Sequence, residues 1–160
     1  MHIERLRERV PSTESLCTGV LNSYSLSFNK RSRDNSGKCN INYTGNEKDK
    51  VFGVIYEIAL SEKQELDRAE GLGLGYAEEN ISVLSECGNI TAFTYIAEKN
   101  VIDDKLRPYF WYRQYVVYGA KHFHLPENYI EMIEKIEYWN DSDEKRAKKN
   151  LEILNRLKGS

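Results

Sequence analysis

The sequence predicts an α+β protein with a mainly antiparallel sheet and helices packed outside it. Stretches that alternate apolar and polar residues, as half-buried strands do, fill the first two-thirds of the chain, up to residue 97. Helical spacing of apolar residues dominates the last third. Turn sequences at residues 35–37 (NSG) and 87–89 (CGN) separate neighbouring strand candidates and favour hairpins. Strands followed by helices, rather than alternating with them, indicate this fold class.

The N-terminal part is predicted to hold one short helix and two strands. Residues 2–10 (HIERLRERV) carry apolar side chains at helical spacing, and Pro11 follows, so we expect a helix that ends there. Residues 19–28 alternate through tyrosine, leucine and phenylalanine, which predicts one continuous strand. Residues 38–43 alternate in the same way and predict a second strand, antiparallel to the first across a hairpin.

The middle of the chain is predicted to be mainly strand. Residues 51–60 (VFGVIYEIAL) are almost continuously apolar, which favours a strand at a central position in the sheet. Ser61 with Gln64 three residues later matches a capping box and predicts a helix over residues 62–69. Two further strands are expected at residues 79–85 and 90–97.

The last third is predicted to be helical. Apolar residues at helical spacing indicate helices over about residues 104–121 and 127–137. The charged segment 143–158 keeps three leucines on one side, so we expect it to dock as a peripheral helix. No internal repeat or linker interrupts the chain.

Composition places the chain among soluble globular proteins of one domain. Its 160 residues are enough to bury a core, and 40% hydrophobic with 30% charged residues is ordinary for this class. The net charge is -2 and the two basic clusters lie beside acidic residues, so we expect no nucleic-acid partner. No apolar run approaches the ~20 residues that a membrane-spanning helix needs, and no signal peptide opens the chain. We therefore expect a cytoplasmic protein without a membrane partner, whose three cysteines are reduced.

One carboxylate, Glu70, lies between the helix predicted at residues 62–69 and the glycine-rich sequence GLGLG at residues 71–75. A rigid element on one side and a bare backbone on the other suit a ligand site, although a solvated acid at a helix end has the same pattern. We expect Leu66, Leu72 and Leu74 to give this carboxylate an apolar setting. The glycines are no dinucleotide loop, because a helix precedes them and a strand follows.

No other motif in the sequence indicates a metal or nucleophile site. His122 and His124 form a His-x-His pair, but no carboxylate or cysteine partner accompanies them, so structural or surface histidines are the better interpretation. None of the three cysteines adjoins a histidine.

Several segments in a fixed order resemble the gamma-glutamylcyclotransferase-like family. The similarity covers about residues 3–137. Its segments are ERLRERVPS, SLSFN, GKCNIN, VFGVIYEI, LDRAEG, GY, TYIAE and YVVYGAKHFHLPENYIEMI. Each segment alone is weakly specific, whereas their joint order and spacing are typical of that family.

The resemblance implies a small antiparallel β-barrel with peripheral helices, over residues 1–140, and a peripheral C-terminal helix over residues 141–160. It also implies conversion of a gamma-glutamyl amide into 5-oxoproline and the free amine, without a metal or other cofactor. By position in the family's segments, Glu70 resembles the catalytic acid/base, and Tyr76, Tyr95 and Tyr112 resemble substrate-contacting tyrosines. Composition alone favours a core or half-buried strand or helix residue for each of the three tyrosines. The expected partner is a small-molecule gamma-glutamyl substrate, and the expected state is a monomer or homodimer.

The chain departs from the family pattern at its start. The family opens with an apolar strand that runs into Tyr-Gly-Ser-Asn, a turn whose backbone N–H groups bind the substrate. Here Met1 stands directly after the position of that asparagine. We therefore expect a truncated chain or a start placed too far downstream, and a poorer catalyst than an extended chain. The alternative is a non-catalytic binding or structural module on the same fold, and a weaker one is that the charged C-terminal helix mediates oligomerisation.

Overall fold

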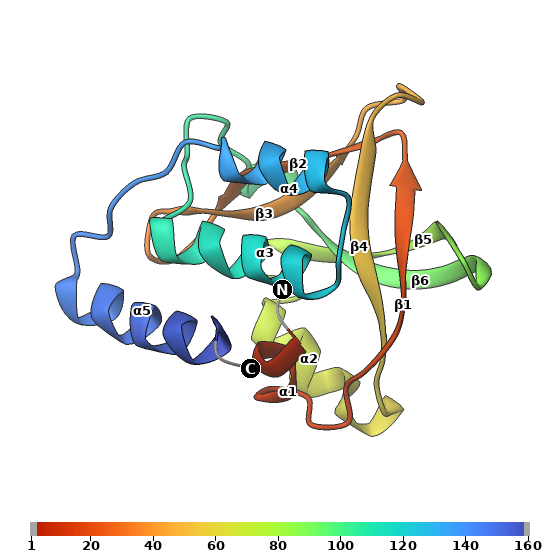
Figure 1. The fold of residues 1–160 in the computed structure, drawn as a ribbon, viewed down its shortest axis with the longest axis horizontal. Helices are drawn as coiled ribbons and strands as arrows, with labels where there is room; N and C mark the ends of the chain where they lie inside the picture. Colours follow the sequence, from red (N-terminus) through yellow and green to blue (C-terminus); the bar gives the residue numbers. More distant parts are fainter. Residues whose placement is uncertain (1–2, 159–160) are drawn as a thin grey trace.

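A computed structural model describes residues 3–158 and has the predicted α+β class (Figure 1). The strands in chain order are β1 (Glu14–Asn22), β2 (Tyr24–Arg31), β3 (Gly37–Tyr43), β4 (Lys50–Glu57), β5 (Tyr76–Ser85) and β6 (Gly88–Ala97). The helices are α1 (Ile3–Arg7), α2 (Lys63–Glu70), α3 (Phe110–His122), α4 (Glu127–Glu134) and α5 (Glu144–Lys158), with 3₁₀ turns η1 (Leu60–Glu62) and η2 (Lys99–Val101).

The strands form two antiparallel sheets that do not close into a barrel, which corrects the barrel part of the prediction. One sheet has the order β4-β1-β5-β6, and the other is the hairpin of β2 and β3. Helices α3 and α4 cover the β2–β3 hairpin, and α5 packs along α3 (Figure 1). On the opposite side, α1 and α2 lie side by side below the sheet (Figure 1).

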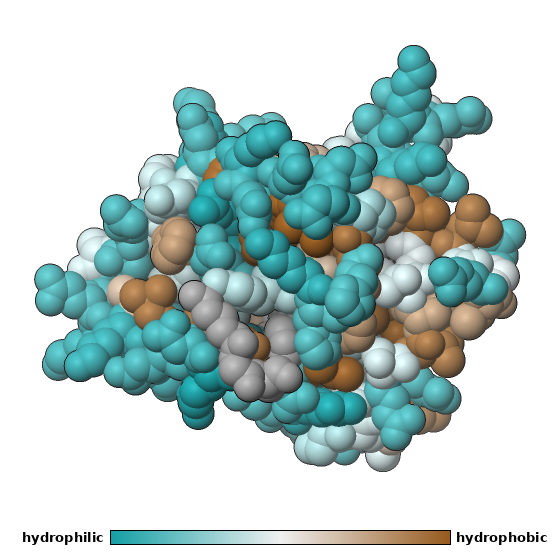
Figure 2. Space-filling view, in the orientation of Figure 1, coloured by the Kyte–Doolittle hydropathy of each residue, from teal (hydrophilic) through white to brown (hydrophobic). Residues whose placement is uncertain are grey.

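Three clusters of buried side chains join these layers. The largest lies between β2, α3 and α4 and contains Phe28, Val117, Ala120, Tyr129, Ile130 and Ile133. The second joins α3 to α5 through Tyr109, Trp111, Tyr115 and Leu154. The third joins α1 to α2 through Leu6, Val10 and Leu66. Figure 2 shows hydrophilic side chains over most of the surface in this view, with hydrophobic ones gathered over the four-stranded sheet at the right.

Residues 19–28 are not one strand, as the alternation predicted. The chain turns at Ser23, which has φ 66° and donates its N–H to the Asp49 carbonyl at 2.8 Å. Residues before the turn belong to β1 and those after it to β2, in different sheets. The alternation continues through a turn of one residue, so the sequence pattern does not reveal it. The predicted hairpin with residues 38–43 is confirmed as β2–β3, with Leu26 opposite Ile41.

Strand β4 lies at an edge of the four-stranded sheet and not at its centre. Its apolar side chains are nevertheless covered by helices, which explains the continuous apolar pattern. The Phe52 ring packs on Tyr129 of α4 at 5.2 Å between centroids, and Tyr56 packs on Phe123 at 6.0 Å. The predicted central position is therefore wrong: β4 is an edge strand, most of whose residues are half-buried.

The capping box predicted at Ser61 does not form. Residues 60–62 make the 3₁₀ turn η1, and α2 begins at Lys63 without a side-chain cap. The Glu62 carboxylate instead accepts hydrogen bonds from the N–H and the hydroxyl of Ser12, at 3.0 and 2.6 Å. Helix α3 also begins later than predicted, at residue 110, because Tyr109 is extended and pairs with Trp139. Residues 79–85 and 90–97 are confirmed as strands within β5 and β6.

Candidate functional site

Glu70 is the last residue of α2, directly before a turn of glycines. Gly71 ends the helix with φ 76°, in the left-handed conformation that glycine adopts without a Cβ clash. The N–H of Leu72 donates to the Asp67 carbonyl at 2.9 Å, which completes a Schellman end. Regular helix therefore fixes the Glu70 backbone, and the turn then leads the chain into Tyr76 at the start of β5.

Arg9 binds the Glu70 carboxylate. Its Nη1 donates to Glu70 Oε1 at 2.9 Å, and the two side chains are 33% and 20% exposed. Among residues 3–158, no hydrogen bond to Glu70 Oε2 is found, so one carboxylate oxygen is engaged and the other is available. Sequence analysis missed Arg9, because its cluster has the composition of a solvated helix face. The guanidinium reaches the site because the chain beyond α1 folds back toward α2, through the buried contacts of Leu6 and Val10 with Leu66.

A second cation lies on the β2 side of the site. Lys30 Nζ lies 4.5 Å from the centroid of the Tyr76 ring. Burial lowers the pKa of Lys30, while the nearby Glu70 charge acts in the opposite direction. The backbone at Gly75 passes so close that a Cβ there would lie 3.3 Å from Lys30 Cε. Glu70 is therefore bound by one cation, Arg9, and lies near enough to a second, Lys30, to influence its pKa.

Tyr76 and Tyr112 meet at the backbone of Cys39. The Tyr76 hydroxyl donates to the Cys39 carbonyl at 2.7 Å, and the Cys39 N–H donates to the Tyr112 hydroxyl at 3.2 Å. Burial raises the pKa of both tyrosines well above the ordinary value, and the Glu70 charge adds to this effect at Tyr76. Both hydroxyls are therefore protonated near neutral pH. Burial also raises the pKa of the Cys39 thiol to about 11, which leaves little thiolate for nucleophilic chemistry.

Tyr95 lies apart from that pair, on the other side of α2. Its hydroxyl donates to Asp67 Oδ1 at 2.6 Å, one turn of helix before Glu70. Lys63 also binds Asp67 and reaches Glu78 of β5, and its ammonium lies 5.5 Å from the Tyr95 ring centroid. These contacts join α2 to β5 and β6. Tyr95 thus positions the helix that carries Glu70.

The predicted apolar setting of Glu70 is only partly present. Leu66 is buried, at 7% exposed, but Leu72 and Leu74 are 38% and 73% exposed. The glycine turn directs these two side chains to solvent. Polar and charged groups therefore form most of the surroundings of Glu70, a result that the alternating glycine-leucine sequence does not reveal.

The two histidines of the His-x-His pair lie at the end of α3 and in the turn after it. Among residues 3–158, no group of three His, Cys, Asp or Glu side chains could hold a metal ion. His122 packs against the Phe123 ring at 4.9 Å, and His124 is an exposed residue with φ 51° in the turn after α3. In the same part of the chain, every helix is too short or too polar to cross a membrane.

The sequence matches the model of the AIG2-like family over residues 50–133, which include α2, Glu70 and the two strands after it. That span is more than half of the chain and bears out the family resemblance seen in the sequence. No curated protein is similar enough in sequence to be matched.

Solved structures agree over almost the whole chain. A structure described as gamma-glutamyl cyclotransferase is 25% identical with a TM-score of 0.82, covering 97% of this chain and 92% of that one. A crystal structure of an uncharacterized protein from Homo sapiens is also 25% identical, with a TM-score of 0.81 and coverage of 96% and 92%. YkqA from Bacillus subtilis is 16% identical with a TM-score of 0.69, covering 86% of this chain and half of that one, and shows the fold alone.

Proposed function

Since this chain belongs to the AIG2-like family and has the gamma-glutamylcyclotransferase-like fold, we propose that it cyclises a gamma-glutamyl amide to 5-oxoproline and releases the amine. The observation that carries the proposal is Glu70: a carboxylate on a rigid helix end, held through one oxygen by Arg9 and followed by the Tyr76 that begins β5. This is the arrangement that a proton-transferring carboxylate requires, with a fixed position and one oxygen available.

The chemistry follows from the substrate. Its α-amino nitrogen attacks its own γ-carbonyl carbon, a C–N bond forms to close the five-membered ring, and the C–N bond to the leaving amine breaks. Intramolecular attack has a large proximity advantage, so the protein has mainly to fold the substrate and move protons. Glu70 takes a proton from the substrate ammonium and returns one to the departing amine. No redox step or group acceptor is involved.

The surrounding residues have distinct roles in the proposal. Arg9 orients Glu70 and supplies a positive charge for the substrate's α-carboxylate. Tyr76 and Tyr112, both protonated, fix the backbone at Cys39 and form one wall. Tyr95, which the resemblance makes a substrate-contacting residue, is assigned here a positioning role through its hydrogen bond to Asp67.

A panel of gamma-glutamyl amino acids, gamma-glutamyl amines and glutathione tests the proposal, with released 5-oxoproline measured by mass spectrometry. We expect release from at least one class, and its loss in Glu70→Gln. Glu65→Gln is the matched control, because Glu65 is an acid on the same helix that is 59% exposed and is paired with the exposed Arg68. Undiminished release by Glu70→Gln, or equal loss in both variants, would remove Glu70 from the reaction.

The alternative proposal is a binding or structural module without turnover. Two observations favour it: Glu70 is already ion-paired, and it lines neither of the two cavities described below. This reading predicts that no member of the panel yields 5-oxoproline, while one of them still raises the melting temperature by binding the folded chain.

A further inference from the structure

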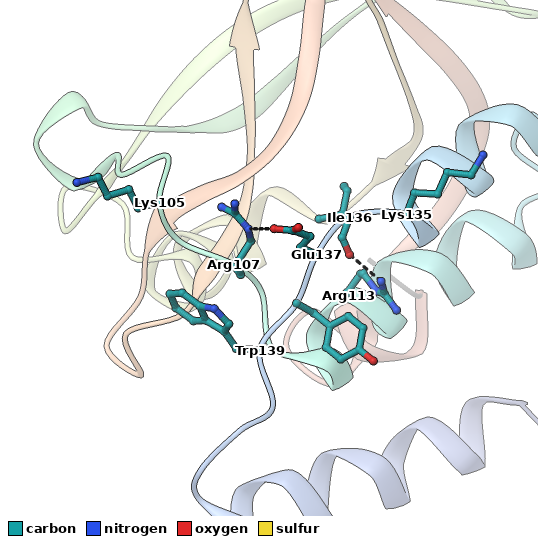
Figure 3. A pocket seen from close by; sticks show the side chains of 8 residues that line it. Lys105, Arg107, Arg113, Lys135, Ile136, Glu137 and Trp139 are labelled. Atoms are coloured by element: carbon teal, nitrogen blue, oxygen red, sulfur yellow. Dashed lines mark hydrogen bonds and ion pairs between the residues drawn. The ribbon is translucent and has the colours of Figure 1, made fainter.

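A cavity lies away from Glu70, between the start of α3 and the segment that follows α4 (Figure 3). Its volume is about 560 Å³, within the range of small-molecule sites. Cationic and aromatic side chains dominate its lining: Lys105, Arg107, Arg113, Lys135, Tyr138 and Trp139. A smaller cavity of about 310 Å³ shares Arg107, Ile136 and Glu137 with it. None of the residues around Glu70 belongs to either lining.

The lining of this cavity carries four cationic side chains and one carboxylate. Two of the cations are ion-paired: Arg107 Nε donates to the Glu137 carboxylate at 3.0 Å, and Lys135 Nζ lies 3.4 Å from the Glu131 carboxylate, outside the lining. Arg113 is only 8% exposed and has no carboxylate partner among residues 3–158. Its Nη1 donates to the Glu134 and Ile136 carbonyls, both at 2.7 Å, and its buried Nε has no hydrogen-bond partner in that same part of the chain. Buried charges are normally paired, so this guanidinium favours an anion nearby.

Trp139 adds an exposed aromatic ring whose backbone is held in place by two hydrogen bonds. The backbone N–H of Trp139 donates to the Pro108 carbonyl at 2.9 Å, and its backbone carbonyl accepts the Phe110 N–H at 3.0 Å. The indole is 42% exposed and contacts no other ring within residues 3–158. Its neighbour differs, because the Tyr138 ring covers the Arg113 guanidinium at 4.4 Å. In Figure 3, Trp139 lies beside Arg107, whereas Lys105 and Lys135 extend outward at opposite ends.

We propose that this cavity binds a free mononucleotide, that is, a small organic phosphate with a planar ring. Arg107 contacts the phosphate directly, and Lys105, Lys135 and Arg113 supply the surrounding positive field. The planar base stacks on Trp139, as bases do on exposed aromatic side chains. The volume suits one nucleotide unit, and the exposed indole distinguishes the site from one for inorganic phosphate alone. Arg113 also caps the carbonyl end of α4, so it is structural as well and is not the residue to substitute.

Isothermal titration of the whole chain with ADP, pyrophosphate and adenosine tests the site. We expect saturable ADP binding that weakens with added salt, weaker binding of pyrophosphate, and none of adenosine over the same range. Lys105→Gln with Arg107→Gln should weaken ADP binding at least tenfold. Lys50→Gln, which removes an exposed lysine on β4, should leave it unchanged.

The aromatic contribution is tested separately. Trp139→Leu should weaken ADP binding but not pyrophosphate binding, and Trp139→Phe should restore most of it; circular dichroism establishes that each variant is folded. No saturable ADP binding up to about 1 mM, equal weakening by Lys50→Gln, or tighter binding of a short single-stranded RNA than of ADP would overturn the proposal. Glu70→Gln should bind ADP like the wild type. The nucleotide site and the cyclotransferase proposal can therefore be refuted separately.

Discussion

One buried carboxylate helps to attach α5, beside the apolar contacts of Leu154, and its removal makes a sharp test. Asp141, whose side chain is fully buried, accepts hydrogen bonds from Arg146 Nε at 2.7 Å and from the Trp111 indole at 2.9 Å. Arg146 also binds the second carboxylate oxygen at 2.5 Å, so the pair is bidentate. Asp141→Asn keeps the shape but removes the charge. We expect α5 to be held less tightly and the free energy of unfolding to fall.

The magnitude follows from the pKa of the carboxyl. Hydrogen bonding to Arg146 lowers the pKa of Asp141 to about 2, against about 4 in an unfolded chain. That difference alone corresponds to roughly 2–3 kcal/mol. Because the Arg146 side chain is 34% exposed, solvent screening reduces the contribution, and we expect about 1–2 kcal/mol. A lowered pKa means that the contribution is complete above about pH 4 and is lost as the pH falls toward 2.

Urea unfolding followed by circular dichroism, from pH 7 down to pH 2, measures the contribution of the Asp141 carboxylate to the free energy of unfolding. The difference in unfolding free energy between wild type and Asp141→Asn should be constant at higher pH and should shrink below about pH 4. Asp143→Asn is the control: Asp143 caps α5 through a 2.9 Å bond to the Arg146 N–H, and asparagine caps equally well. It removes only a 3.8 Å ion pair with Arg146, in which the Asp143 side chain is 50% exposed, so its cost should be small. A difference that persists unchanged at pH 2, or that Asp143→Asn reproduces, would refute the reasoning.

Three further predictions concern the packing around both ends of the fold. Leu154→Ala, at a position 3% exposed, should cost about 2–4 kcal/mol of unfolding free energy, whereas Leu151→Ala, at 40% exposed, should cost less than about 1 kcal/mol in the same urea titration. Gly75→Ala should lower the melting temperature, because φ is 124° there and the strain is about 1–3 kcal/mol; an unchanged melting temperature would contradict the turn geometry. Tyr95→Phe should lower the free energy of unfolding by about 1–3 kcal/mol, because it removes the 2.6 Å hydrogen bond to Asp67. Any loss of activity in this variant should appear in kcat with KM little changed, as expected of a positioning residue.

The sequence predicted those parts of the fold in which a local pattern and its tertiary setting agree. The β5–β6 pair and helices α4 and α5 belong here, since their periodicity is matched by the partners that bury them. It did not predict the turn at Ser23, because one residue with positive φ leaves the alternation on both sides intact. It also misplaced β4, because burial under helices and burial between strands leave the same apolar pattern.

The candidate site was predictable only in its local part. Glu70 stood out because a helix end and a glycine turn are both visible within ten residues of sequence. Arg9 and Lys30 did not, because they reach Glu70 from elements distant in the sequence, and a charged residue on a short helix or a strand carries no mark of its partner. The positions of the three tyrosines could not be predicted for the same reason. Tyr76 and Tyr112 both bind the backbone of Cys39, whereas Tyr95 binds Asp67 of α2, and no spacing in the sequence distinguishes the two cases.

The measurement that tests the central claim most directly is kcat/KM for 5-oxoproline release by Glu70→Gln, beside wild type and Glu65→Gln, on the best substrate of the panel. Proton transfer by a positioned carboxylate typically raises the rate about 10²–10⁴-fold. The kcat/KM of Glu70→Gln should therefore fall by that factor, while the kcat/KM of Glu65→Gln stays near the wild-type value. A fall of less than about threefold in Glu70→Gln, with release still catalysed, would contradict the assignment of Glu70 as the acid/base.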